Sequence, residues 1–193
     1  MTTPPKVTLV TCSSMPHLFP GEEGLLDELA SRGCDPQIKV WNDPDVDWSD
    51  VGMVVVRSVS DYAQERPAFL EWTRQLRRVQ NSADVLDWNT DKHYLRELAA
   101  LGMPTIPTSW LEPEQNLSKH QIHTRFPAFG EFVVKPAVSS GVRDIGRYTT
   151  VDIHQRQAAM RQVQGLLGDG RSVMIQRYVE EIDLHGEISL VFF

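Results

Sequence analysis

The sequence has little cysteine and no long apolar run. Its 193 residues include two cysteines, Cys12 and Cys34, whose spacing fits neither a metal-binding pattern nor a disulfide framework. Such sparing use of cysteine fits a reducing compartment. No apolar run approaches the roughly 18 residues of a membrane-spanning helix, and residues 1–16 lack the long apolar segment of a secretory signal. We therefore expect a soluble, cytoplasmic protein with no membrane partner.

A strongly basic face is also missing. The formal net charge is -7, and Arg77–Arg78 is the one adjacent basic pair, which a solvated helix face explains. Because binding to duplex nucleic acid depends on neutralising phosphates, we expect no nucleic-acid partner. The six histidines show no ligand spacing on a shared face, so no metal site is predicted within the chain.

The first 111 residues alternate between strand and helix patterns. We expect strands at 6–12, 36–41, 51–58, 83–88 and 105–111, and helices at 22–33, 66–80 and 89–102. This alternation predicts a parallel sheet with helices on both sides. The continuous apolar run at 51–58 predicts a strand buried on both faces. The first turn lacks G-x-G-x-x-G, which disfavours a nicotinamide dehydrogenase.

The pattern changes after residue 112 to that of an α+β unit. A polar stretch covers 112–130, strands at 131–136 and 143–150 are expected to pair antiparallel, and a helix at 152–168 has Asp152 as its N-cap. A strand at 171–179, a loop at 180–186 and a strand at 187–193 follow. Because an apolar strand at the end of a chain leaves an exposed edge, we expect this chain to be a fragment of a longer protein.

Lys135 stands at the end of an apolar strand, in "VVKPAVSSG" (133–141). Burying a lysine is costly unless an anion meets it. The small residues beyond it let backbone N–H groups approach such an anion closely, and Ser139 and Ser140 add hydroxyl donors. The stretch predicts a phosphate clamp; the alternative is a hairpin with a flexible tip.

A second stretch, "MIQRYVEEIDLHGE" (174–187), places a strand before an acidic loop. The backbone of such a crossover can meet the edge of an adenine, and a carboxylate further on can accept from ribose hydroxyls. The alternative is an amphipathic strand followed by a solvated turn.

Taken with two upstream segments, these stretches resemble the ATP-grasp superfamily, in particular the glutathione-synthetase-like ligases that include the cycloserine-biosynthesis type. "VVVRSVSDY" (54–62) resembles their IRS-x-x-DY segment, and "WNTDKHYLRELAALGMPTIPT" (88–108) their N-x-x-DK…L…G-x-P-x-P-x-T segment. "VVKP…SSG" and "QRYVEE…GEISLVFF" resemble the nucleotide lid and hinge.

The resemblance implies an α/β fold. A Rossmann-like pre-ATP-grasp domain with a parallel sheet would span 1–111, an α+β ATP-grasp lid subdomain 112–176, and an incomplete start of the C-terminal ATP-grasp subdomain 177–193.

It also implies a set of ATP contacts. Lys92 would reach the phosphates, and Lys135 would reach the α-phosphate and the base. The small-residue loop would cover the β- and γ-phosphates. The hinge would hold adenine, partly through its backbone, and Glu187 would hold the ribose. The full set is Lys92, Lys135, Ser139, Ser140, Gly141, Gln176, Arg177, Tyr178, Val179 and Glu187. Glu180 and Asp183 are lesser candidates. For Lys92 the alternative is a solvated lysine in the first turn of a helix.

Substrate candidates follow the predicted strand at 51–58, where ligands gather in open α/β sheets. They are Arg57, Ser58, Asp61 and Tyr62. The alternative for Arg57 is a pair with a structural carboxylate. Cys12 fits a small core residue better than a nucleophile.

The implied reaction is ATP-dependent ligation of a carboxylate to an amine or a thiol through an acyl phosphate, with Mg²⁺. The metal ligands are expected beyond Phe193, so the chain alone should lack catalytic residues and be inactive. Partners would be small-molecule carboxylate and amine substrates, and a homo-oligomer is possible. Two alternatives remain: a non-catalytic adenine-nucleotide-binding or regulatory module, and an unrelated α/β domain.

Overall fold

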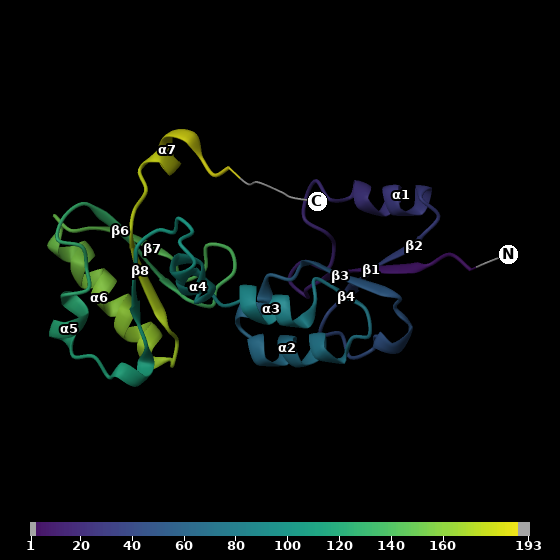
Figure 1. Ribbon diagram of the computed structural model, residues 1–193, viewed down its shortest axis with the longest axis horizontal. Coiled ribbons are helices and arrows are strands. Elements are labelled where there is room, and N and C mark those ends of the chain that lie inside the picture. Colours follow the sequence, from purple (N-terminus) through teal and green to yellow (C-terminus); the bar gives the residue numbers. More distant parts are fainter. Residues whose placement is uncertain (1–2, 189–193) are drawn as a thin grey trace. The chain divides into compact units, whose positions relative to one another are not determined.

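The computed structural model describes residues 3–188, which fold into two compact units (Figure 1). The N-terminal unit comprises Met1–Tyr94 together with Ser139–Gly141, and the second unit comprises Leu95–Val138 and Val142–Phe193. The predicted division into domains at residues 111 and 176 stays a prediction.

The N-terminal unit is built on a parallel sheet, as the alternating pattern predicted. Its elements are β1 (Lys6–Thr11), α1 (Gly24–Ser31), β2 (Asp35–Val40), β3 (Met53–Ser58), α2 (Arg66–Gln75), β4 (Val79–Gln80) and α3 (Ala83–Asn89). The strands lie in the order β2-β1-β3-β4, and each neighbouring pair is parallel. Short 3₁₀ turns at Trp48–Asp50 and Asp61–Ala63 flank β3.

The core of this unit lies on one face of the sheet. Val10 and Val54 pack with Phe69 and Trp72 of α2, and all of these side chains are buried. Trp41 extends the cluster through an edge-on contact with Phe69, with ring centroids 5.5 Å apart. Each fully buried large apolar side chain contributes about 1.5–3 kcal/mol, so this face supplies most of the unit's stability.

The prediction that the strand at 51–58 is buried on both faces was wrong. Val54 is buried, but Met53 and Val55, which alternate with it on the other face, are only half-buried. The reason is that α1 buries none of its residues, so it shields that face incompletely.

Near residue 80, one strand prediction was wrong in type and two helix predictions were wrong in their limits. The segment 83–88 is helix α3 rather than a strand, because the hydroxyl of Ser82 accepts from the N–H of Val85 and caps a first turn. The helix predicted at 89–102 starts only at Tyr94, since Thr90 ends α3. The helix predicted at 66–80 ends at Gln75, where Leu76 turns to an extended backbone and leads into β4.

The second unit is an antiparallel sheet with helices. Its elements are α4 (Tyr94–Ala100, beginning at the last residue of the N-terminal unit), β5 (Thr108–Leu111), α5 (Lys119–His123), β6 (Glu131–Pro136), β7 (Gly146–Thr149), α6 (Ile153–Gly168), β8 (Val173–Arg177) and α7 (Glu181–His185). The strand order is β5-β8-β6-β7, and all neighbours are antiparallel. The predicted hairpin of β6 and β7 is confirmed, and so is the Asp152 cap of α6.

One face of this sheet is the core. Phe132 and Val134 of β6 pack with Ile175 of β8 and with Ala159 and Val163 of α6, and all five are buried. Because strand side chains alternate between faces, the residues between them point to the opposite face. That opposite face is therefore formed by Val133, Lys135, Met174 and Gln176.

Sequence reasoning missed short helices in this unit. The stretch 112–130 contains α5, which a reciprocal pair of hydrogen bonds between Ser118 and Gln121 caps. The predicted loop at 180–186 holds α7. Of the strand predicted at 187–193, residues 187 and 188 are in neither strand nor helix, and the rest lies outside the described residues. None of the helices within residues 3–188 has the length and apolarity needed to cross a membrane.

Gly52 should be indispensable for the N-terminal unit. Its φ is 71°, and a Cβ there would lie 2.2 Å from the carbonyl oxygen of Lys6. A left-handed backbone costs a non-glycine residue about 1–2 kcal/mol. The clash of the added Cβ with the Lys6 carbonyl costs about 1–3 kcal/mol more. We therefore expect Gly52→Ala to lower the free energy of unfolding by about 2–5 kcal/mol, measured by urea titration of tryptophan fluorescence.

Gly33→Ala is the matched control, because Gly33 has a φ of 80° but a Cβ added there would have no neighbouring atom within 4 Å. It should cost about 1–2 kcal/mol. Equal losses in the two variants would contradict the close approach of Gly52 to Lys6.

Candidate nucleotide site

Lys135 lies on the sheet face opposite α6, near the end of β6. Its neighbour across the ladder is Met174 of β8, which is fully buried and pairs on its other side with Trp110 of β5. Burial lowers the pKa of the Lys135 ammonium, and the charge of Glu187 opposes that shift. A lysine in this position is a cation without full solvation, which is the chemical state that favours an anionic ligand.

Gln176 lies on the same face as Lys135. It is 5% exposed and pairs with Val133 of β6 and with Thr108 of β5. Its Nε2 donates to Oγ1 of Thr108 over 2.8 Å. An amide and an ammonium thus share one face of the sheet, and both were predicted to contact ATP.

The predicted hinge residues after β8 are partly engaged within the fold. The N–H of Tyr178 donates to the carbonyl of Glu131 over 2.9 Å, and the carbonyl of Val179 accepts from the N–H of Ile182 over 3.1 Å. The Arg177 guanidinium lies 4.4 Å from the ring centroid of Phe129. The Tyr178 N–H and the Val179 carbonyl therefore hold the chain at the start of α7. The contacts of the hinge with adenine stay a prediction.

The tip of the small-residue loop belongs to the N-terminal unit. Ser139 is buried, and Nζ of Lys92 donates to its carbonyl over 3.0 Å and to its hydroxyl over 2.8 Å. The hydroxyl of Tyr62 also donates to the Ser139 carbonyl, over 3.1 Å. Gly141, with a φ of 63°, is exposed. The structure thus brings together Lys92 and Ser139, which were both predicted to contact ATP, and Tyr62, which was predicted to contact the substrate.

Arg57 and Ser58 meet a residue that sequence reasoning missed. The Glu22 carboxylate pairs with the Arg57 guanidinium and accepts from the Ser58 hydroxyl over 3.2 Å. Ser58 is 1% exposed and also accepts from the N–H of Phe19 over 3.3 Å. The alternative given for Arg57, a structural carboxylate partner, therefore describes its contacts. The concentration of acidic residues at 22–28 is the sequence feature that could have suggested Glu22 as the partner of Arg57.

Asp61 and Cys12 lie at the carboxyl ends of β3 and β1. Asp61 accepts from the indole N–H of Trp41 over 2.8 Å. The Cys12 thiol is buried; burial alone would raise its pKa, but hydrogen bonds with Ser14 and Ser60 outweigh this and lower it. Because the sulfur has no exposed surface, the contacts favour the predicted core role over nucleophilic chemistry.

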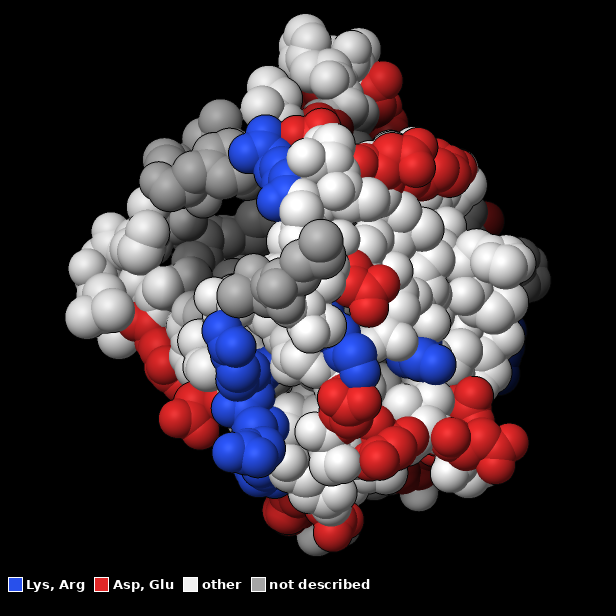
Figure 2. Space-filling model, turned by 90° about the vertical axis from the view of Figure 1, so that its right-hand side faces the viewer, with Lys and Arg blue, Asp and Glu red and all other residues white. Residues whose placement is uncertain are grey.

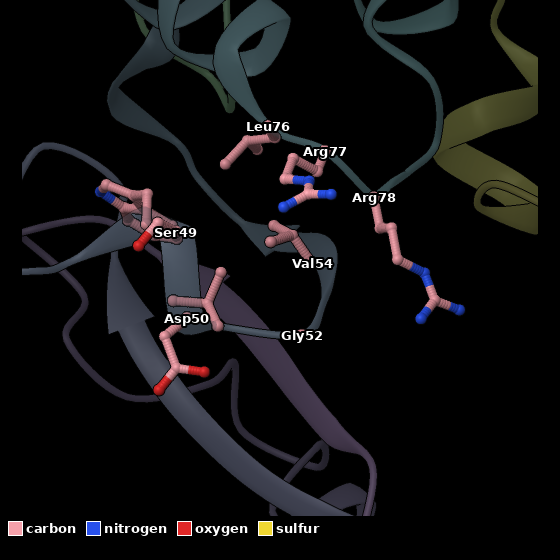
Figure 3. Close-up of a pocket in the computed structure, with 9 residues that line it drawn as sticks. Ser49, Asp50, Gly52, Val54, Leu76, Arg77 and Arg78 are labelled. Carbon is pink, nitrogen blue, oxygen red and sulfur yellow. The ribbon is translucent and has the colours of Figure 1, made fainter.

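A cavity of about 360 Å³ opens at the other end of β3, beside Gly52 (Figure 3). Asp50, Val54 and Leu76 line it, and in Figure 3 the Arg77 side chain reaches toward it while Arg78 points away. No predicted site residue lines this cavity. Figure 2 shows basic side chains in several separate places among acidic ones, without a broad basic patch on the face in view.

Within residues 3–188, no group of three or more histidine, cysteine, aspartate or glutamate side chains could hold a metal ion. The part of the chain that the structure describes therefore offers cationic and amide groups for a ligand but no metal-ligand cluster.

Comparisons with known proteins show what this chain is similar to. Residues 7–83 match a family model described as the N-terminal domain of the D-cycloserine synthetase DcsG. The cycloserine biosynthesis protein DcsG of Streptomyces lavendulae is 34% identical over 174 residues, which is 88% of this chain and 57% of that protein. The crystal structure of D-cycloserine synthetase DcsG superposes with a TM-score of 0.78 at 31% identity. The chain is similar in sequence and in fold to this synthetase.

More distant ATP-grasp structures share the fold alone. A RimK domain ATP-grasp protein from Sphaerobacter thermophilus gives a TM-score of 0.65 at 15% identity, over 90% of this chain and 64% of that one. D-alanine–D-alanine ligase from Bacillus anthracis complexed with ATP gives 0.58 at 11% identity, over 92% and 58%. The match to DcsG covers 93% of this chain and 61% of that structure. The chain thus spans somewhat more than half the length of these proteins and shares the fold of the part that it covers.

The half-buried Lys135 should reduce the stability of the chain in the absence of a ligand. Because the folded state lowers the pKa of Lys135, the folded chain holds this proton less tightly than the unfolded chain. The resulting cost is fully present below the lowered pKa and disappears as the pH rises to the ordinary value of 10.5. We expect Lys135→Met to raise Tm by about 2–4 °C at pH 7, with the gain shrinking toward pH 10.5.

Lys119→Met, at an exposed lysine in the first turn of α5, is the control and should leave Tm nearly unchanged. A gain from Lys135→Met that does not depend on pH would show that added apolar contact, not removal of a buried charge, is responsible.

Proposed function

We propose that this chain provides the N-terminal and nucleotide-binding parts of an ATP-dependent ligase that joins a carboxylate to an amine through an acyl phosphate. The observation that carries the proposal is the half-buried Lys135 on a sheet face with Gln176, in a chain 34% identical to a cycloserine biosynthesis protein. A thiol in place of the amine would use the same nucleotide site.

The residues present fit ATP. Lys135 supplies a poorly solvated cation for a phosphate, and Gln176 supplies an amide for the base on the same face. Ser140 and Gly141 are small enough for backbone N–H groups to approach phosphate oxygens. Glu187, whose charge acts on Lys135, is exposed and is the proposed acceptor for ribose hydroxyls. The ligand set is therefore cationic for the phosphates and polar for the nucleoside.

Phosphoryl transfer requires positioning and charge neutralisation more than covalent help from the protein. Lys135 would neutralise phosphate charge. Lys92 is the second cation of the proposed set, and its ammonium already donates to two oxygens of Ser139. An anionic phosphate is a stronger acceptor than a carbonyl or a hydroxyl, so it would displace Ser139 as the partner of Lys92. The predicted need for Mg²⁺ stays part of the proposal, with ligands outside residues 3–188.

The proposed substrates are small-molecule carboxylates and amines, handled in the cytoplasm. On the N-terminal unit, the carboxyl end of β3 remains the proposed substrate side. Glu22 already pairs with Arg57 and accepts from Ser58. Asp61 and Tyr62 are therefore the stronger candidates for substrate contact. A homo-oligomeric state is compatible with the proposal and plays no part in it.

Calorimetric titration with Mg-ATP tests this function. The wild-type chain should bind one nucleotide, and Lys135→Ala should weaken binding at least about tenfold, or roughly 1.4 kcal/mol. Lys119→Ala, which removes an exposed lysine of the same unit, should bind like the wild type.

Equal weakening by both lysine substitutions would point to a general effect of charge rather than a phosphate contact of Lys135. Absence of saturable binding by the wild-type chain would overturn the proposed nucleotide site.

A further inference from the structure

A short chain of hydrogen bonds fixes the direction of the Gln176 amide. The hydroxyl of Thr108 donates to the carbonyl of Ile106 over 2.8 Å. A carbonyl oxygen can only accept, so the single proton of the Thr108 hydroxyl is committed to it. The Thr108 oxygen must then act as the acceptor in its contact with Gln176.

Only the NH₂ end of an amide can donate to that oxygen. The 2.8 Å contact between Thr108 and Gln176 is therefore made by Nε2, and the carbonyl oxygen Oε1 is turned away from Thr108. The assignment of the two amide atoms follows from the chemistry of Ile106 and Thr108. A flipped amide would set its oxygen against the lone pairs of the hydroxyl, which is unfavourable.

The oxygen fixed in this way is an acceptor on the face that carries Lys135. Gln176 is 5% exposed, so its amide is held among its neighbours rather than free in solvent. No group among residues 3–188 donates to its Oε1. A ligand group that can donate a hydrogen bond would satisfy this oxygen, whereas a ligand carbonyl would be repelled.

We propose that Thr108 is a positioning residue that makes the site select a purine with a six-amino group over a purine with a six-oxo group. This inference rests on the proposed function, in which Gln176 contacts the base of ATP. The amino group of adenine donates to the fixed Oε1. Inosine triphosphate carries a carbonyl at the same position and would face an acceptor. When the wrong ligand binds, hydrogen-bonding groups of the site are left unpaired, and the cost of leaving them unpaired favours the correct ligand strongly.

Competition between ATP and inosine triphosphate tests the inference, because the two differ only at position six and the adjacent ring nitrogen. The wild-type chain should bind ATP at least about tenfold more tightly than inosine triphosphate. Thr108→Val keeps the shape and β-propensity of the side chain but removes the acceptor, so the Gln176 amide can flip. The ATP preference should then fall at least about fivefold, through weaker ATP binding and stronger binding of inosine triphosphate.

Thr108→Ser restores the hydroxyl and should keep the wild-type preference within about twofold. Ser109→Ala is the control for the strand, because Ser109 pairs with Ile175 and so points to the opposite face of the sheet. Tm of each variant checks that the fold is retained.

The outcomes separate this inference from the function on which it rests. A wild-type chain that binds both nucleotides equally, or a Thr108→Val chain that keeps the full ATP preference, overturns the role of Thr108 and leaves the nucleotide site standing. A wild-type chain that binds neither nucleotide overturns both proposals. Loss of preference in Thr108→Ser as well would assign the effect to packing rather than to the hydroxyl.

Discussion

The alternation of side chains along β6 and β8 is the constraint on which the candidate site depends. One set of positions, with Phe132, Val134 and Ile175, packs against α6 and holds the unit together. The set between them, with Lys135 and Gln176, is thereby directed to the opposite face. Core and candidate site are thus two faces of the same strands, and a shift of register by one residue would exchange them. This coupling explains how a partly desolvated lysine is tolerated: the apolar face that stabilises the sheet also forces Lys135 into its place.

The patterns that were predicted correctly are those set by local periodicity. The parallel sheet of the N-terminal unit follows from the strand and helix alternation. The β6–β7 hairpin follows from two expected strands on either side of a small-residue loop. The cap at Asp152 is a local signal as well. The segment 83–88 failed because its apolar residues suit a strand by composition, whereas the Ser82 cap starts a helix. Partial burial of β3 could not be predicted, because it depends on how poorly α1 packs.

The site was predictable in its residue types and less so in its contacts. Lys135 could be predicted because a lysine at the end of an apolar strand is costly to desolvate. In the structure, burial lowers its pKa. The contacts of Arg57 with Glu22, and of Lys92 and Tyr62 with Ser139, join residues far apart in the chain. No local pattern specifies such pairs. Thr108 escaped notice for the same reason, since its partner Gln176 is brought to it only by the pairing of β5 with β8.

The central claim is that Lys135 is held partly desolvated so that it can meet a phosphate. Its most direct test is a pH titration of Lys135 by NMR, with ¹³C-labelled lysine, in the absence and presence of saturating ATP. We predict a pKa below the ordinary value of 10.5 in the free chain, and a clear rise when the nucleotide supplies the missing negative charge. A Lys135 pKa that is the same with and without bound ATP would contradict this claim, because the nucleotide would then be binding away from this lysine.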